Sequence, residues 1–127
     1  MLIGSSGGWQ TQAARDLEKS FACVCRTDEP TGPRVNPLQL ASLLQELLSV
    51  APAVMAWLDD EPCWALVELG RLIESRPNAL ACGVGPDPEW CWAGSVKYHV
   101  QARGFPVWNN IPETVSAARL LGQRERS

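Results

Sequence analysis

The chain has 127 residues, of which 46% are hydrophobic and 20% are charged. This length suits one globular domain with a buried core, and the apolar content excludes an intrinsically disordered chain. No stretch of about 18 apolar residues is present, so a membrane span is not expected, and residues 1–4 are too short and uncharged for a signal peptide. The formal net charge is −3 without a block of Lys and Arg, which argues against direct binding to nucleic acid.

The cysteines indicate a reducing environment. Their number, five, does not fit a fully paired secreted framework. Only Cys23 and Cys25 are closely spaced, there is no C-x-x-C motif, and His99 is the only histidine, so a four-ligand zinc site is not expected. We therefore expect reduced, mostly buried cysteines in a cytoplasmic protein that holds no metal and no cofactor.

The first part of the chain predicts two short strands and two helices. Residues 1–4 form a short apolar strand, and residues 10–20 carry apolar side chains at helical spacing. Residues 21–25 form a second β-prone run. A second helix begins at Asn36-Pro37, because Asn is a favoured N-cap and Pro fits the first helical position. The leucines that line this helix are Leu40, Leu43, Leu44, Leu47 and Leu48.

The middle of the chain predicts two buried strands with a helix between them. Residues 53–58 and 79–84 are continuous apolar runs, which are typical of strands buried on both faces of a parallel sheet. The acidic run 59–61 follows the first of them and favours the start of a helix there. Apolar residues then recur at helical spacing up to Arg76.

The last third predicts two helices around a fifth strand. Residues 90–103 fit a helix better than a strand, because their apolar residues do not alternate over a sustained stretch. Gly104 closes this helix, and residues 105–108 form a short strand-like run. Asn110 is the expected cap of a final helix, which ends at Gly122.

The order strand–helix thus occurs five times. Alternating elements are typical of an α/β domain with a parallel sheet and right-handed crossovers. Five such units in 127 residues match the size of a flavodoxin-like three-layer sandwich, with a five-stranded parallel sheet in the order 2-1-3-4-5. We expect a single domain over residues 1–122, followed by a polar tail over residues 123–127.

Three segments give the chain a resemblance to the receiver domain of bacterial response regulators. Residues 2–6 correspond to the first receiver strand and the acidic pair that follows it. Residues 53–62 and the helix after them are similar to the third strand, its proline and the third helix. Residues 101–110 are similar to the approach to the fifth strand and its end. The resemblance covers nearly the whole chain and implies a flavodoxin-like fold in a cytoplasmic bacterial protein of signal transduction.

The chain departs from the receiver pattern at the positions that phosphotransfer needs. Serines occupy positions 5 and 6, where receivers carry the acidic pair that binds Mg²⁺. Leu58 stands in the place of the phosphoacceptor Asp, with Asp59 one residue away, and Asn109 or Asn110 replaces the Lys after the fifth strand. An aspartyl phosphate needs a divalent cation and a Lys to offset its charge. The resemblance therefore implies a degenerate receiver that takes no phosphate.

Two loops at the expected carboxyl edge of the sheet are candidate ligand sites. The Gly4–Gly8 loop leads from a strand into a helix, and its N–H groups suit a phosphate, although it matches neither standard phosphate-binding motif. The acidic run 59–61 lies where open α/β sheets bind ligands, and it suits helix capping, a metal or a partner contact. The candidate residues of this edge are Ser5, Ser6, Asp59, Asp60 and Glu61.

The tryptophans favour a partner-binding face in the last third of the chain. Trp is enriched at interface hot spots, and the chain has six. Trp90 and Trp92 stand at a loop-to-helix junction two positions apart, so they point about 200° apart and do not share one core face. Trp108 ends the fifth run beside Asn109 and Asn110, where burial is usually partial. Core packing with a paired indole N–H is the alternative for each Trp.

These observations favour a non-catalytic regulatory module that acts by binding another protein or a second copy of itself, independently of phosphorylation. In receivers the fourth helix, the fifth strand and the fifth helix form the output face, and the same span here holds three tryptophans. One alternative is a flavodoxin-like enzyme or binding protein that takes a small ligand or nucleotide at the Gly4–Gly8 loop. Another is a stand-alone inhibitor or adaptor from a mobile element.

Overall fold

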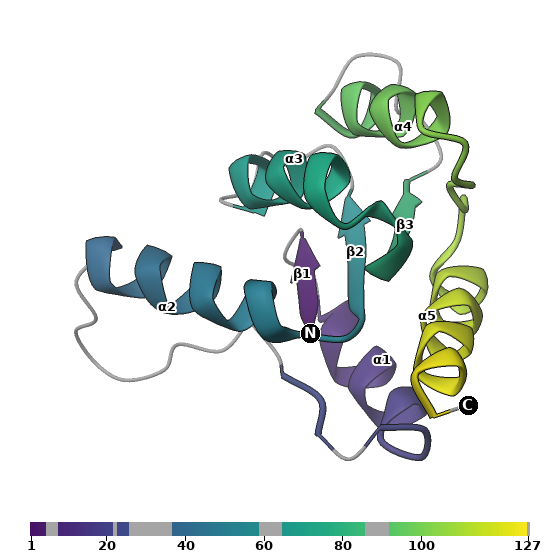
Figure 1. Cartoon of the computed structure of the whole chain (residues 1–127). Helices are drawn as coiled ribbons and strands as arrows, with labels where there is room; N and C mark the ends of the chain where they lie inside the picture. Colours follow the sequence, from purple (N-terminus) through teal and green to yellow (C-terminus); the bar gives the residue numbers. More distant parts are fainter. Residues whose placement is uncertain (5–7, 22, 26–36, 59–64, 86–91, 127) are drawn as a thin grey trace.

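The protein is an α/β domain built on a parallel sheet (Figure 1). Its strands are β1 (Leu2–Gly4), β2 (Val54–Leu58) and β3 (Leu80–Val84), in the spatial order β1-β2-β3. The register pairs Ile3 with Ala56 and Ala56 with Cys82. The computed structural model describes residues 1–4, 8–21, 23–25, 37–58, 65–85 and 92–126. The α/β class and the parallel sheet are therefore confirmed, and the described residues contain three of the five expected strands.

All the predicted helices are present. They occupy the ranges α1 (Trp9–Leu17), α2 (Pro37–Val50), α3 (Ala65–Ser75), α4 (Trp92–Ala102) and α5 (Ile111–Arg126), with a 3-10 turn at η1 (Pro77–Ala79). The segment predicted as helical within residues 90–103 is helix α4, and α2 begins at the proline that favours a first helical position. No helix of the described residues is long and apolar enough to cross a membrane.

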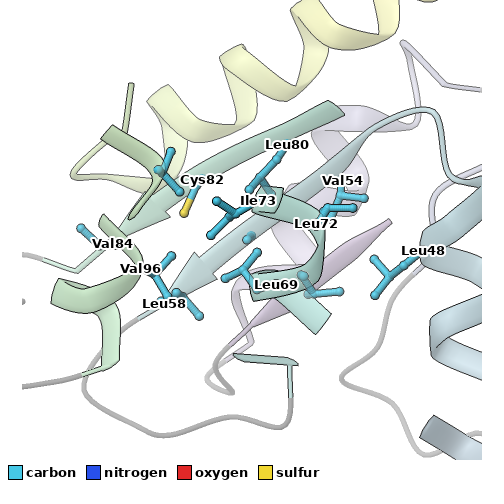
Figure 2. Packing of buried hydrophobic residues seen from close by; sticks show 13 residues of the cluster. Leu48, Val54, Leu58, Leu69, Leu72, Ile73, Leu80, Cys82, Val84 and Val96 are labelled. Carbon is cyan, nitrogen blue, oxygen red and sulfur yellow. The ribbon is translucent and has the colours of Figure 1, made fainter. Parts of the chain in front are cut away.

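Alternating strand residues build two hydrophobic clusters, one on each face of the sheet. Every residue of β2 and β3 is buried, as their continuous apolar runs predicted. On one face, α3 and α4 cover a cluster that includes Val54, Leu69 and Val96 (Figure 2). On the other face, α1 and α5 pack on a cluster that includes Met55 and Ala118. The three layers follow from this division, with the sheet in the middle.

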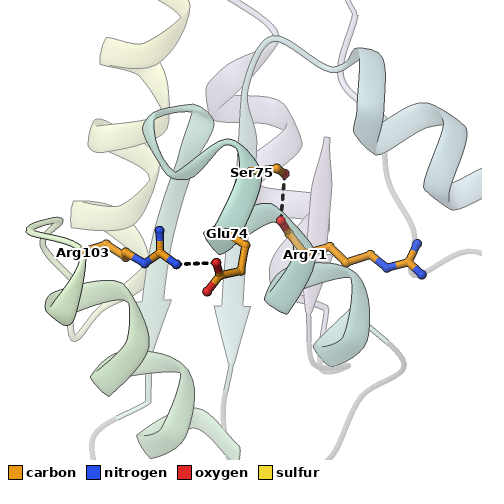
Figure 3. A network of polar contacts seen from close by, with 4 residues as sticks. All are labelled: Arg71, Glu74, Ser75 and Arg103. Atoms are coloured by element: carbon orange, nitrogen blue, oxygen red, sulfur yellow. Dashed lines mark hydrogen bonds and ion pairs between the residues drawn. The ribbon is translucent and has the colours of Figure 1, made fainter.

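Polar contacts join neighbouring helices on the first face and support α3 internally. The Arg103 guanidinium forms an ion pair with Glu74, which joins the end of α4 to α3 (Figure 3). The Ser75 hydroxyl donates to the backbone oxygen of Arg71 at 2.8 Å. The Arg76 guanidinium donates to backbone oxygens at the end of α2, including that of Leu48 at 2.8 Å. Helix α2 extends away from the sheet and joins the body at this end (Figure 1).

The end of α5 differs from the prediction. The helix does not stop at Gly122 but continues to Arg126, so residues 123–126 of the expected polar tail are helical. Gly122 is buried, and a Cβ at this position would overlap the ring of Phe21. A glycine is tolerated in a helix at a cost of about 1 kcal/mol, and here it leaves room for an aromatic ring.

The expected second and fifth strands are not confirmed as strands. On one edge of the sheet, the Leu2 N–H donates to the Cys25 oxygen at 2.9 Å. On the other edge, Trp108 forms an isolated parallel bridge with Gly83. Pro106 has no N–H to donate, which restricts the ladder that residues 105–108 can form. The chain therefore follows both edges of the sheet through a few backbone hydrogen bonds.

Candidate functional site

The carboxyl edge of the sheet is where the sequence predicted ligand-binding loops. Parallel strands end at one common edge, so β1, β2 and β3 all lead into it. Ser5, Ser6, Asp59, Asp60 and Glu61 follow β1 and β2 and lie outside the described residues, so the proposed phosphate or metal sites there stay predictions. Within the part of the chain that the structure describes, no group of three or more His, Cys, Asp and Glu residues is placed to hold a metal ion.

The two ends of the Gly4–Gly8 loop have structural roles. Gly4 has a φ of 139°, and a Cβ there would overlap the backbone oxygen of Trp57 on the neighbouring strand. Gly8 has a φ of 79° and is the N-cap of α1. Both conformations are ones that glycine adopts readily. Glycine at these two positions is therefore explained by the backbone alone.

The three tryptophans of the predicted partner face are described to different extents. Trp90 lies outside the described residues, and for Trp92 the structure gives its position as the first residue of α4. Trp108 is half-buried and packs against the cluster beneath α1 and α5. Its partial burial agrees with the prediction from its place beside a polar turn, and it leaves part of the indole accessible.

Backbone hydrogen bonds fix Trp108 on the edge of β3. The Trp108 N–H donates to the oxygen of Cys82 at 3.1 Å, and the Val84 N–H donates to the oxygen of Trp108 at 2.9 Å. The two bonds hold the residue in the plane of the sheet. Its side chain therefore has a defined position relative to α5, which begins three residues later.

The turn between Trp108 and α5 caps the helix. Asn109 and Asn110 are exposed, and the Asn110 side-chain oxygen accepts a hydrogen bond from the Glu113 N–H at 2.9 Å. This confirms Asn110 as the predicted cap. The Asn110 side chain thus has a structural role, which is separate from the predicted contact with a partner.

Helix α5 sits directly on β3 through its first turn. Thr114 is fully buried, and its hydroxyl donates to the backbone oxygen of Asn110 at 2.8 Å. It lies over Gly83, where a Cβ would overlap the Thr114 hydroxyl oxygen and approach the ring of Trp57 to 2.8 Å. The absence of a side chain at Gly83 therefore allows this close approach. The contact makes the β3 edge and the start of α5 one packed unit.

A shallow depression lies beside this unit. Leu120 on α5 is 56% exposed, although the core positions of the same helix, Val115 and Ala118, are buried. Residue 120 is two positions beyond residue 118, which turns its side chain about 200° away from that core position. The sequence did not single out Leu120 as a candidate. Its position in the helical repeat lies away from the buried residues of α5, and this position is the signal that could have identified it. The depression is lined by Trp108, Pro112, Glu113, Ser116, Ala117 and Leu120.

Elsewhere in the described part of the chain, two other large apolar side chains are exposed. Val50 is 75% exposed at the end of α2, and Tyr98 is 69% exposed on α4. The Tyr98 ring contacts the ring of His99 edge to face, with centroids 5.4 Å apart. Single exposed apolar residues are normal on protein surfaces. Among the described residues, the depression beside Trp108 combines a half-buried Trp with an exposed Leu.

Comparison of the chain with protein-family models, with curated proteins and with solved structures finds no match. The resemblance to receiver domains therefore stays an expectation drawn from the sequence. What the chain can do has to be argued from its own residues.

Proposed function

We propose that the chain is a non-catalytic regulatory module that binds a protein partner through the α5 face. We define the α5 face as Trp108, Pro112, Ala117 and Leu120. The observation that carries the proposal is that Leu120, which is 56% exposed, lies with the half-buried Trp108 along one depression. Tryptophans in partly covered pockets with apolar neighbours are typical centres of protein interfaces.

The receiver resemblance supports the same location. It implies a five-stranded sheet in the order 2-1-3-4-5 and an output face made by the fourth helix, the fifth strand and the fifth helix. The observed strands β1, β2 and β3 are the first, third and fourth of the expected strands, so their observed order agrees with 1-3-4 in the middle of that arrangement. Trp108 belongs to the expected fifth strand, and its bridge to Gly83 lies beside β3. In this proposal the module works in the cytoplasm, and its partner is another protein or a second copy of the chain.

Binding through the α5 face is tested with a matched pair of variants. Leu120→Arg places a charge on the face, and Val50→Arg places the same charge on another exposed apolar residue, at the end of α2. Partners are captured from source cells with the wild-type chain as bait, and self-association is measured by sedimentation. We expect Leu120→Arg to weaken the interaction by about thirtyfold or more, as at an interface hot spot, and Val50→Arg to leave it unchanged.

Two results would contradict the proposal. One is equal binding by the wild-type chain and Leu120→Arg. The other is a wild-type chain that is monomeric by sedimentation and that captures no more protein from source cells than the Leu120→Arg variant does.

Independence from phosphorylation is tested separately. The chain is incubated with acetyl phosphate and Mg²⁺, and its intact mass is measured. We expect no gain of about 80 Da, the mass of one phosphoryl group, because the receiver positions for Mg²⁺ and phosphate hold serines and Leu58. A stable gain that Asp59→Asn abolishes would instead show a working phosphorylation site.

A further inference from the structure

Residues 105–108, which we call the edge segment, are the outermost described part of the sheet on the β3 side (Figure 1). Their side chains alternate between the two faces of the sheet. Phe105 and Val107 pack against the cluster beneath α3 and α4, whereas Trp108 packs against the cluster beneath α1 and α5. Such alternation is typical of an extended strand, so the edge segment has the backbone form that a further strand can join.

The backbone N–H and oxygen of Val107 point away from β3. Trp108 uses both its own N–H and its own oxygen on Cys82 and Val84 of β3. Successive backbone groups of a strand point to opposite sides within the plane of the sheet, so those of Val107 point outward. Neither group is hydrogen-bonded in the part of the chain that the structure describes. The edge segment therefore presents an unused donor and an unused acceptor, which form a template for an added strand.

The depression of the α5 face lies where side chains of an added strand would point. Helix α5 packs on β3 through Thr114 and Gly83, and Gly83 is also the residue that bridges to Trp108. The depression is bordered by Trp108 together with outward residues of α5 that include Leu120. It therefore lies on the outer side of the edge segment, on the face that carries the indole. Every second side chain of a strand added there would point toward it.

We propose that the α5 face takes an extended segment of the partner, which adds a strand to the edge segment and places alternate side chains in the depression. This inference rests on the proposed function and names the form in which the partner binds. Main-chain hydrogen bonds combined with pockets for alternate side chains are a recurring mode of peptide recognition.

Glu113 determines which charge the added segment carries. It is exposed and lines the depression with Trp108 and Leu120, and no described basic side chain pairs with it. A Lys or Arg placed at an alternate position from an apolar residue complements this lining. In a second copy bound on the same edge, the two-fold axis passes beside Val107 and brings the two Glu113 side chains toward each other, which like charges disfavour. The occupant is therefore a segment of a different protein.

Peptide selection tests the chemistry of the occupant. A phage-displayed library of random peptides of about 12 residues, long enough for one strand, is first depleted on the Leu120→Arg variant and then selected on the wild-type chain. We expect the selected peptides to carry a Lys or Arg two positions from an apolar residue. Selection on Glu113→Lys should exchange this basic residue for Asp or Glu.

N-methylation of a selected peptide tests the strand pairing. Each N-methyl group removes one backbone N–H, and in an added strand only every second N–H faces the edge segment. We expect methylation at alternate positions to weaken binding about tenfold and methylation at the positions between them to have little effect. A peptide bound as a helix would not give this alternation.

Two variants of Val107 test the same hydrogen bonds from the other side. Val107→Pro removes the outward N–H, whereas Val107→Ala keeps it and shortens the side chain. We expect Val107→Pro to bind the selected peptide about tenfold more weakly and Val107→Ala to bind it like the wild-type chain. The N-methylated peptides keep the test valid if Val107→Pro folds poorly.

The possible failures separate this inference from the proposed function. If the selected peptides require Leu120 but show no alternation on methylation, or lack the basic residue, the inference is wrong while the proposed function stands. The inference is also wrong if no peptide prefers the wild-type chain to Leu120→Arg. Self-association that Val107→Pro abolishes would identify a second copy as the occupant instead. Failure of Leu120→Arg to weaken capture of the partner from source cells would contradict the proposed function itself.

Discussion

The two edges of the sheet are built differently. At the β3 edge, Trp108 exchanges two backbone hydrogen bonds with β3, and Thr114 is seated over Gly83. At the β1 edge, the Leu2 N–H donates to the Cys25 oxygen, and a small cavity lies behind the described part of this segment. The β3 edge is thus a packed support that holds apolar side chains toward solvent, whereas the described part of the β1 edge has a cavity behind it and carries an exposed cysteine, Cys23. A rigid support suits a protein interface.

The strongest test of the packed edge is Gly83→Ala. The new Cβ would overlap the Thr114 hydroxyl oxygen and crowd the Trp57 ring, so α5 or β2 must move. We expect a loss of about 3 kcal/mol in the free energy of unfolding, measured by urea denaturation, which is typical of overpacking in a core. Gly70→Ala is the control, because nothing lies within 4 Å of its Cβ in α3, and we expect it to stabilise the protein by up to about 1 kcal/mol.

Trp108 is expected to contribute both to stability and to binding. Trp108→Ala should lower the free energy of unfolding by about 2 kcal/mol, because the residue is partly buried, and should weaken partner binding about thirtyfold. Leu120→Ala should weaken binding while it changes stability by less than about 0.5 kcal/mol. Urea denaturation and binding measurements on the same samples separate the two effects. If Trp108→Ala is destabilised but binds the partner normally, the indole is not part of the interface.

The cap of α5 should have a smaller effect. Asn110→Ala removes the acceptor for the Glu113 N–H at the end of α5 that faces β3, and we expect a loss of about 1 kcal/mol. Asn109→Ala alters an exposed neighbour for which no such bond is seen, and it should change stability by less than about 0.5 kcal/mol. Thermal unfolding of both variants measures the difference. Equal effects from the two substitutions would show that the cap contributes nothing to the packed edge.

The thiol of Cys23 at the β1 edge and that of Cys82 within the sheet should differ in reactivity. Burial raises the pKa of the Cys82 thiol from about 9.0 to about 12, whereas Cys23 is exposed. Iodoacetamide at neutral pH should therefore alkylate Cys23 in the folded protein and reach Cys82 only after unfolding, because the thiolate is the reactive form. Peptide mass spectrometry at successive times measures the two rates. Comparable rates would mean that β3 opens readily.

The raised pKa of Cys82 also sets the direction of a pH effect. Below pH 9 this thiol is protonated in both the folded and the unfolded chain, so it adds no pH dependence. Between pH 9 and 12 the unfolded chain loses the proton while the folded chain keeps it, so stability falls as the pH rises.

Features that depend on local sequence were predictable. The apolar runs located β2 and β3, Pro37 marked the start of α2, and Asn110 marked the cap of α5. Features that depend on distant contacts were not. The Phe21 ring, which comes from the other end of the chain, occupies the space at Gly122 where a helix end was expected. The exposure of Leu120 likewise depends on how α5 is rotated on the sheet, and that rotation is determined by the packing of Thr114 on Gly83.

The way in which Arg76 holds α2 has a mechanical consequence. One guanidinium donates to the backbone oxygens of Leu48, Ser49 and Ala51 at a single end of a 14-residue helix. Such a helix is about 21 Å long, so a rotation of about 10° at the held end corresponds to a displacement of about 4 Å at the opposite end. The position of the first turn of α2 therefore depends strongly on the geometry at residues 48–51, where the Arg76 guanidinium and the buried Leu48 side chain join the helix to the body.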